Sequence, residues 1–198
     1  MDEPKTCKLV TDFCKKHTHG TFLDLGAHVG AYAIPIAKLG LKVIAVEPSP
    51  DTFKSLAHNA QLNNVNSNIV LVNAAAWDYD GTAKLYLSRL GGHGDSLLKG
   101  HSLSNGWVEV QTKSLSTLLD EVGELDIAKI DIERGELRVL KQAGDKVNRV
   151  STWIIEVSDV TKRDIWNLMR EQGFECRIIE RLLGTKGTYN MLCTRHSS

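Results

Sequence analysis

Short apolar runs of strand length alternate with segments of helical period along most of this 198-residue chain. A run of roughly four to eight apolar residues indicates a strand, and apolar residues that recur every three to four positions indicate a helix. Strands that alternate with helices form a parallel sheet with helices on both faces. The predicted strands span residues 20–25, 42–46, 68–73, 125–132 and 151–157, and the predicted helices span residues 4–17, 29–39, 51–63, 114–121, 161–172 and a segment from about 135.

The carboxyl end of the chain departs from this alternation. Two strand-like runs, "FECRIIER" and "TYNMLCTR", are separated only by the glycine-bearing turn "LLGTKG". Two strands joined by so short a turn form a hairpin, which makes the last strand antiparallel to its neighbour. We therefore predict an α/β fold with a doubly wound, mostly parallel seven-stranded sheet that ends in an antiparallel hairpin, which is the Rossmann-like architecture of class I methyltransferases.

One stretch, at about residues 81–113, lies outside the strand–helix pattern. It holds two short strand-like runs, "TAKLYL" and "WVEVQTK", around the glycine-rich segment "GGHGDSLLKGHSLSNG". An insertion of this kind near the carboxyl ends of the strands is typical of a substrate-binding element. The sequence has no internal repeat, low-complexity tract or Pro/Ser-rich linker, so we predict one domain over residues 1–198.

Composition argues against several classes of partner. Lysine plus arginine and aspartate plus glutamate both number 24, so no strong positive field attracts nucleic acid or anionic lipid. The apolar runs are too short to span a bilayer, and the first residues lack the apolar core of a secretory signal. We therefore expect a cytoplasmic protein for which a nucleic-acid partner is disfavoured and a membrane is not a partner.

The four cysteines are Cys7, Cys14, Cys176 and Cys193. The first two are seven residues apart, which places them on one face of the predicted N-terminal helix. No CxxC pair is present, so a zinc site is not expected. We expect all four to be small reduced thiols, as is usual in a reducing compartment.

The segment "FLDLGAHVGAYAIPIAKLG" joins the first predicted strand to the next helix. Its strand contains Asp24 and ends at Gly26, and Gly30 follows four residues later. Ala27 and His28 occupy the positions where a dinucleotide-binding GxGxxG loop needs its middle glycine, and a phosphate-binding GxxxxGK[ST] loop is also absent. An aspartate would repel phosphates but suits a cationic ligand. S-adenosylmethionine has no phosphate and carries an ammonium and a sulfonium, so it is the cofactor that this loop favours.

Polar residues also follow the next two strands. Glu47 ends the second strand, where a carboxylate can accept hydrogen bonds from both ribose hydroxyls, and Pro48 then turns the chain toward the following helix. Asn73 and the small Ala74 follow the third strand and are candidates to border an adenine ring. For Asn73, a role in merely ending the strand is an equal alternative.

These motifs together resemble the FkbM family of S-adenosylmethionine-dependent methyltransferases. The matching segments are "FLDLGAHVGAYAIPIAKLG", "VEPSPDTFKSLAHNAQLNN", "VLVNAAAWDYDG", "LDIAKIDIERGELRVLKQAG" and "WIIEV", in family order from residue 20 to about 160. The resemblance implies that Asp24, Gly26, Gly30 and Glu47 bind the cofactor, which becomes S-adenosylhomocysteine. It also implies methylation of a hydroxyl on a sugar, polyketide or related small molecule. One position departs from the family pattern, because Arg134 stands where the family has glycine.

Two acids, Asp131 and Glu133, alternate with apolar residues at the end of the strand "LDIAKIDI". Three roles are open for them: a general base or orienting group for the acceptor hydroxyl, ligands of a divalent metal, or a structural pair with Lys129. We favour the base or orienting role without a required metal. Glu156, at the end of "WIIEV", is a further polar candidate.

The sequence therefore predicts an S-adenosylmethionine-dependent O-methyltransferase that acts on a small molecule. Two alternatives remain. The segments "GAYAIPIAKLG" and "NAQLNNV" are also similar to transfer-RNA methyltransferases, although the NPP[YFW]-type signature of enzymes that methylate base amino groups is replaced by "IDIERG". The second alternative is a non-catalytic module that only binds the cofactor.

Overall fold

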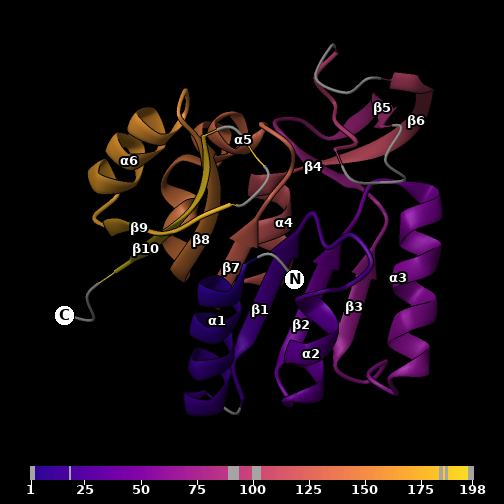
Figure 1. Cartoon of the computed structure of the whole chain (residues 1–198), viewed down its shortest axis with the longest axis horizontal. Coiled ribbons are helices and arrows are strands. Elements are labelled where there is room, and N and C mark those ends of the chain that lie inside the picture. The colour runs from indigo at the N-terminus through magenta and orange to yellow at the C-terminus, as the bar shows by residue number, and fades with distance from the viewer. Residues whose placement is uncertain are drawn as a thin grey trace.

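A seven-stranded sheet with the strand order β3-β2-β1-β7-β8-β10-β9 runs through the protein (Figure 1). A computed structural model describes residues 3–17, 19–88, 94–99, 104–182, 185 and 187–195. Neighbouring strands pair in parallel except β10, which is antiparallel to both β8 and β9. The predicted fold class is therefore confirmed. The strands are β1 (Thr21–Leu25), β2 (Lys42–Val46), β3 (Ile69–Val72), β7 (Leu125–Ile130), β8 (Val150–Ser158), β9 (Glu175–Arg181) and β10 (Thr188–Thr194).

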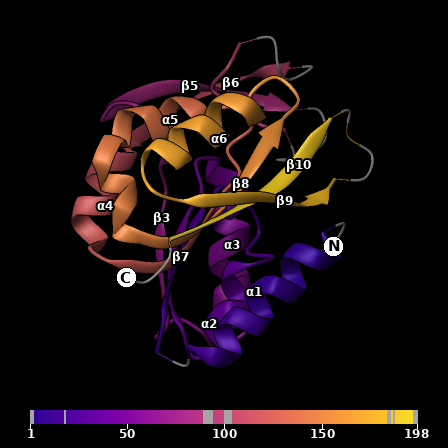
Figure 2. The same ribbon diagram turned by 90° about the vertical axis from the view of Figure 1, so that its left-hand side faces the viewer.

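Three helices pack on each face of this sheet (Figure 2). Consecutive residues of β1 show why, because Phe22 and Leu23 are both fully buried but belong to hydrophobic clusters on opposite faces. A strand covered on both faces needs an apolar side chain at every position. One face carries α1 (Pro4–Lys16), α2 (Ala33–Lys38) and α3 (Pro50–Leu62), and the other carries α4 (Leu115–Val122), α5 (Glu136–Ala143), the 3₁₀ turn η1 (Gly144–Arg149) and α6 (Lys162–Glu171). No described helix has the length and apolar character needed to cross a membrane.

The predicted helix 29–39 proves too long at its amino end, because α2 begins only at Ala33. His28 and Gly30 have left-handed backbone angles, with φ of 50° and 92°. A right-handed helix cannot pass through such residues. The connection from β1 to α2 is consequently a longer loop than the apolar pattern suggested.

The insertion forms a second sheet of its own, in the order β4-β6-β5. Its strands are β4 (Ala75–Trp77), β5 (Gly81–Ser88) and β6 (Ser104–Ser114). Figure 1 shows this sheet beyond the carboxyl ends of β1, β2 and β3. Of the three strands, β4 was not predicted, and the glycine-rich residues 89–93 and 100–103 lie outside the described residues.

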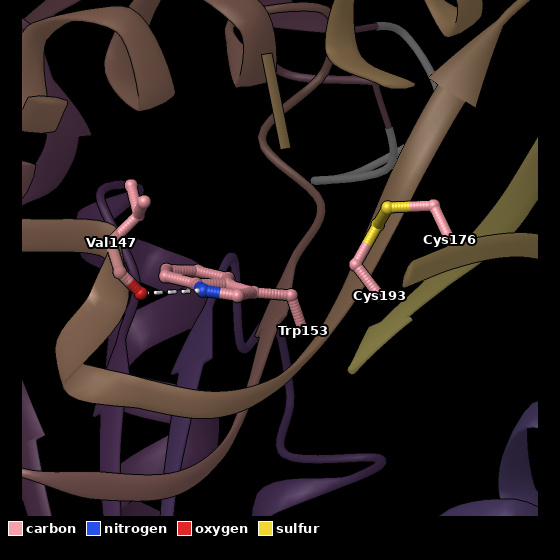
Figure 3. Close-up of a disulfide and its surroundings, with 4 residues drawn as sticks. All are labelled: Val147, Trp153, Cys176 and Cys193. Carbon is pink, nitrogen blue, oxygen red and sulfur yellow. Dashed lines mark hydrogen bonds between the residues drawn. A yellow bond between two sulfur atoms is a disulfide. The ribbon is translucent and has the colours of Figure 1, made fainter. Parts of the chain in front are cut away.

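Two of the cysteines form a disulfide, so the expectation of four reduced thiols is wrong for them. Cys176 in β9 and Cys193 in β10 lie directly opposite each other, with their Cα atoms 4.1 Å apart (Figure 3). The hairpin register brings them together, although 17 positions separate them in the sequence. Cys7 and Cys14 remain thiols.

Candidate functional site

A cavity of about 550 Å³ lies where the loops that follow β1, β2 and β7 meet β8. The strand order reverses between β1 and β7, and ligands of open α/β sheets bind at such a switch point. The rest of the wall comes from strands β4 and β5, the segment 94–99, the start of α1, and Leu182 and Thr185 after β9. The volume is in the usual range for a site that holds a small molecule.

The loop after β1 approaches the end of β7 so closely that only glycine fits at position 26. Gly26 has a φ of 86°, and a Cβ atom there would overlap the carbonyl oxygen of Asp131. The amides of Gly26 and Ala27 both donate to the carbonyl of Val46 at 3.0 Å, which ties the loop to the end of β2. Gly26, Ala27 and His28 line the cavity. Gly30 does not, and a Cβ there would instead press on the side chain of Ile34.

Asp24 lies on the cavity wall with only 2% of its surface exposed. Its Oδ2 atom is buried and has no hydrogen-bond partner among the described residues. Burial raises the pKa of Asp24 to about 6, although the nearby Lys129 opposes the shift. A buried carboxylate oxygen without a partner is costly, and a ligand with a positive or donating group would satisfy it.

Glu47 joins the loops that follow β1 and β2. One carboxylate oxygen accepts a hydrogen bond from the amide of His28 and the other from the amide of Ser49, each at 2.9 Å. Burial raises the pKa of Glu47 to about 7 against the effect of these two bonds. Pro48 follows it on the cavity wall. Each oxygen of Glu47 keeps a further lone pair for a ligand.

The two residues expected after β3 lie outside the set that lines the cavity. Asn73 donates from Nδ2 to the carbonyls of Glu47 at 2.8 Å and Pro48 at 3.2 Å, so it ties the end of β3 to the end of β2. Ala74 is buried beside it. The three residues of β4, 75–77, form the cavity wall instead.

A buried ion pair stands at the end of β7. Lys129 Nζ lies 2.7 Å from Asp131 Oδ2, and the ammonium is 5.0 Å from the centre of the Tyr32 ring. Burial alone would lower the pKa of Lys129, but the carboxylates of Asp131, Asp24 and Glu3 outweigh it and keep the amine protonated. Asp131 is on the cavity wall with 24% of its side chain exposed, and its Oδ1 makes no hydrogen bond within the described part of the chain.

The chain leaves β7 through two residues in the left-handed region, Glu133 at φ 56° and Arg134 at φ 76°. Glycine adopts this conformation without the strain that a side chain brings, which explains the glycine of the family pattern at position 134. The buried Glu136 holds the turn, because its Oε1 accepts from the amides of Ile132 at 3.0 Å and Arg134 at 3.2 Å. Glu133 lines the cavity, and burial and Asp131 raise its pKa.

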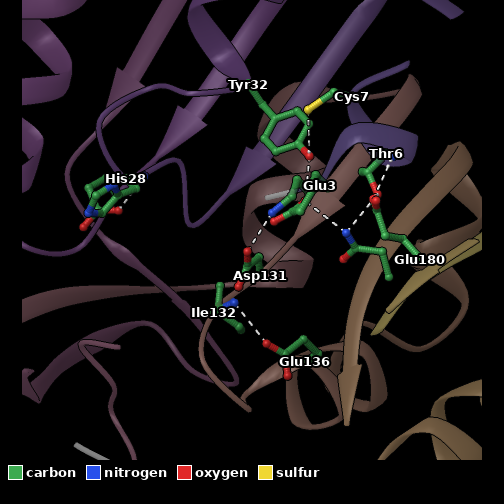
Figure 4. A network of polar contacts seen from close by, with 12 residues as sticks. Glu3, Thr6, Cys7, His28, Tyr32, Asp131, Ile132, Glu136 and Glu180 are labelled. Carbon is green, nitrogen blue, oxygen red and sulfur yellow. Dashed lines mark hydrogen bonds and ion pairs between the residues drawn. The ribbon is translucent and has the colours of Figure 1, made fainter. Parts of the chain in front are cut away.

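The start of α1 closes one side of the cavity, which the sequence did not indicate. Figure 4 shows Glu3, just before this helix, beside Tyr32. Glu3 Oε2 accepts hydrogen bonds from the Tyr32 hydroxyl at 2.6 Å and from Asn190 Nδ2 at 2.9 Å. Glu180 accepts from the amide and the hydroxyl of Thr6, at 3.0 and 2.8 Å. Residues from both ends of the chain thus anchor this wall to the terminal hairpin, a long-range arrangement that no local motif marks.

The raised carboxyl pKa values predict how stability changes with pH. Burial is the main cause in Asp24, with a pKa of about 6, in Glu47 and Glu136, about 7, and in Glu156, about 9. Between the ordinary values of 3.8 to 4.5 and these folded values, the folded protein holds protons that the unfolded chain has released, so stability falls as pH rises. Acids with a lowered pKa, such as Asp80, have finished titrating by about pH 5. We expect the melting temperature of the ligand-free protein to decrease from about pH 5 to about pH 9. A melting temperature that increases over this range, measured by circular dichroism at constant ionic strength, would contradict the prediction.

Among the described residues, no group of three or more His, Cys, Asp or Glu side chains has a geometry that could hold a metal ion.

Solved structures with this fold include methyltransferases. Precorrin-6y C5,15-methyltransferase from Geobacter metallireducens GS-15 superposes with a TM-score of 0.59 at 11% identity, over 96% of this chain and 88% of that one. The N-terminal domain of human METTL16 superposes with a TM-score of 0.60 at 13% identity, over 99% and 70%. At these identities the similarity shows the fold alone.

Curated relatives match at higher identity over shorter lengths. Hexuronic acid methyltransferase AglP of Haloferax volcanii is 27% identical over 159 residues, which cover 78% of this chain and 63% of that protein. A tRNA (guanine(37)-N(1))-methyltransferase of Danio rerio is 40% identical over 63 residues, or 32% of this chain and 13% of that protein. The chain thus spans less than two thirds of the length of either relative. The profile of the methyltransferase FkbM domain matches residues 24–176, well over half of the chain, and the chain therefore belongs to the FkbM methyltransferase family.

Proposed function

We propose that the protein transfers the methyl group of S-adenosylmethionine to a hydroxyl group of a small-molecule acceptor. Its family and fold imply S-adenosylmethionine as the methyl donor. The observation that carries the proposal is the buried Oδ2 of Asp24, which has no hydrogen-bond partner in the described part of the chain and lies in the wall of a cavity of suitable size. This atom suits the ammonium of the cofactor, directly or through a water molecule. The relative that methylates a hexuronic acid supports a small-molecule acceptor.

The residues around Asp24 fit the remaining parts of this cofactor. Glu47 would accept hydrogen bonds from the two ribose hydroxyls with the lone pairs that its backbone contacts leave free. Gly26 lets the loop after β1 lie against the end of β7, so that the backbone of this loop forms part of the cavity wall. The small or apolar residues 75–77 and Pro48 would border the adenine ring.

The cofactor supplies a methyl group made electrophilic by the adjoining sulfonium. Within the protein, Asp131 has one oxygen held by Lys129 and the other directed to no partner among the described residues. We assign this second oxygen to the acceptor hydroxyl, which it would orient and whose proton it would accept during methyl transfer. The ion pair with Lys129 holds the Asp131 side chain in place. Most of the rate gain then comes from positioning the two reactants.

A second candidate function is methylation of transfer RNA. The match to tRNA (guanine(37)-N(1))-methyltransferases favours it, but that match covers only 32% of this chain. A single screen separates the two candidates: methyl transfer from radiolabelled S-adenosylmethionine to sugars, phenols, polyketides and bulk transfer RNA, with and without magnesium. We expect label in small hydroxyl compounds. Label in transfer RNA alone would establish the second function instead.

Glu47→Ala is expected to weaken S-adenosylmethionine binding by about 1–3 kcal/mol, or roughly 5- to 150-fold in Kd, because two ribose hydroxyls lose their acceptor. Titration calorimetry measures the loss, and circular dichroism confirms that the variant is folded. The matched control is Glu171→Ala, since Glu171 is exposed at the end of α6, outside the cavity lining. Absence of wild-type binding at millimolar cofactor would refute the proposed function itself.

A further inference from the structure

Carboxylates dominate the charged wall of the cavity. Of the described Asp, Glu, Lys and Arg residues that line it, only Lys129 carries a positive charge. Two of the acids, Asp24 and Glu47, follow β1 and β2 and belong to the proposed cofactor side. We call the remaining wall near β7 and β8 the acceptor side, and it contains Asp95, Asp131, Glu133 and Glu156.

The acceptor side has little charge of opposite sign. Among the described residues, Lys129 forms an ion pair with Asp131 alone. Arg134, which is not part of the cavity lining, partly opposes the rise in the pKa of Glu133. Asp95 accepts a hydrogen bond from the neutral amide of Ser88 at 2.6 Å. Glu156 makes no hydrogen bond or ion pair within the described residues, although it is only partly exposed. Several carboxylates in a partly enclosed cavity with one ammonium produce a negative potential, which low-dielectric walls strengthen.

Burial and mutual repulsion disfavour the charged forms of these groups, so Glu156 is mostly protonated near neutral pH until a cation binds beside it. Burial raises the pKa of Glu156 to about 9, and the carboxylates of Asp131, Glu136 and Glu133 add to the shift. Burial and Asp131 likewise raise the pKa of Glu133. A cation bound between these two side chains would relieve the repulsion, whereas an anion would increase it.

We propose that the acceptor carries a protonated amine beside the hydroxyl that is methylated, and that Glu133 and Glu156 bind this amine. The inference rests on the proposed function, since it concerns the second substrate of the same site. It separates this protein from its relative AglP, whose named substrate is a hexuronic acid, because the carboxylate of such a sugar would face the carboxylates of the acceptor side.

The first test measures the potential of the acceptor side without knowledge of the substrate. Three nitroxide probes with one ring but different substituents (aminomethyl, carbamoyl and carboxy-PROXYL) carry a positive, zero and negative charge. The protein is saturated with S-adenosylhomocysteine so that the cofactor side is filled. The reporter is the side-chain N–H signal of Trp77, which lines the cavity. We expect the cationic probe to broaden this signal at least about threefold more than the anionic probe at low salt, and less at high salt.

Matched variants test whether the named residues cause the ratio of the broadening by the cationic probe to the broadening by the anionic probe. Glu133→Gln keeps the side-chain shape and should reduce the ratio, and Glu156→Gln should reduce it most near pH 9, where this carboxyl ionises. Glu171→Gln on the exposed end of α6 should not change it. A ratio of one or below in the wild-type protein would overturn the inference. If S-adenosylhomocysteine does not bind at all, the proposed function is wrong. If it binds but the acceptor side does not distinguish the charged probes, only the further inference is wrong.

The second test compares methyl transfer to glucosamine, glucose and glucuronic acid. We expect kcat/KM to decrease in that order, and Glu156→Gln to reduce the advantage of glucosamine over glucose. A preference for glucuronic acid would overturn the inference while leaving a hydroxyl methyltransferase. If none of the three sugars is methylated, the broadening by the cationic probe relative to the anionic probe alone decides whether the acceptor side prefers a cation.

Discussion

Gly26→Ala is expected to abolish cofactor binding and to lower the free energy of unfolding by about 2–5 kcal/mol. About 1–2 kcal/mol comes from placing a side chain at a φ of 86°. A further 1–3 kcal/mol, roughly, comes from the overlap of the new Cβ with the carbonyl oxygen of Asp131, which the backbone must move to relieve. That movement separates the loop after β1 from the loop after β7, and both loops line the cavity. Denaturant unfolding and calorimetry with S-adenosylhomocysteine measure the two effects.

Gly123→Ala is the matched control for this substitution. Gly123 has a φ of 77° but nothing within 4 Å of its Cβ position, and it lies outside the cavity lining. Its replacement should therefore cost only the backbone strain, about 1–2 kcal/mol, and leave cofactor affinity unchanged. If Gly26→Ala were no more harmful than Gly123→Ala in both measurements, the close approach of the two loops would not be what the glycine is needed for.

Local patterns predicted most of the large sheet. Runs such as "KVIAV" at residues 42–46 are apolar at nearly every position because both faces of β2 are covered, and the predicted bounds coincide with the strand. The predicted strands also showed that Asp24 and Glu47 lie close together, because both residues stand where neighbouring parallel strands end. These features depend on residues close together in the sequence, so the sequence reveals them.

The features that were missed depend on contacts between distant segments. The three-residue strand β4 exists because Ala75–Trp77 pairs with the end of β6, more than 30 positions further on. The disulfide of Cys176 and Cys193 follows from the register of the terminal hairpin, which the spacing of the two cysteines in the sequence does not predict. Glu3 reaches the cavity because Tyr32, together with Glu180 and Asn190 of the last two strands, holds the start of α1.

Asn73 shows a different limit of the sequence. Its position at the end of a strand was predicted correctly, but the sequence did not specify where its side chain points. The residue does end its strand beside Glu47, but its amide turns toward the backbone of residues 47 and 48 rather than into the cavity. Whether a polar residue at a strand end faces a ligand or ties neighbouring strands together depends on hydrogen-bond partners. Those partners are supplied by another segment, which the local sequence does not contain.

Asp131→Asn is expected to reduce turnover by roughly 10²- to 10⁴-fold, the usual loss when a general base is removed. The substitution keeps the shape of the side chain and removes the charge that accepts the hydroxyl proton. Cofactor affinity should change far less, because Asp24 and Glu47 lie on loops from other strands. Turnover per folded molecule is measured with an acceptor found in the screen, and Glu171→Gln, which alters an exposed acid outside the cavity lining, is the control.

The ion pair with Lys129 makes stability a necessary second measurement for this variant. Removing one partner of a buried pair leaves the other charge less compensated, so the melting temperature of Asp131→Asn should fall. The fall should be limited, because Asp131 is partly exposed and Lys129 keeps the carboxylates of Asp24 and Glu3 nearby. If the aspartate served only this pairing, the variant would melt earlier but retain full turnover per folded molecule. If it held a metal, wild-type activity would disappear with a chelator and return with magnesium. A large loss of turnover in folded Asp131→Asn, together with wild-type activity that a chelator does not affect, is the combination that the base or orienting role requires.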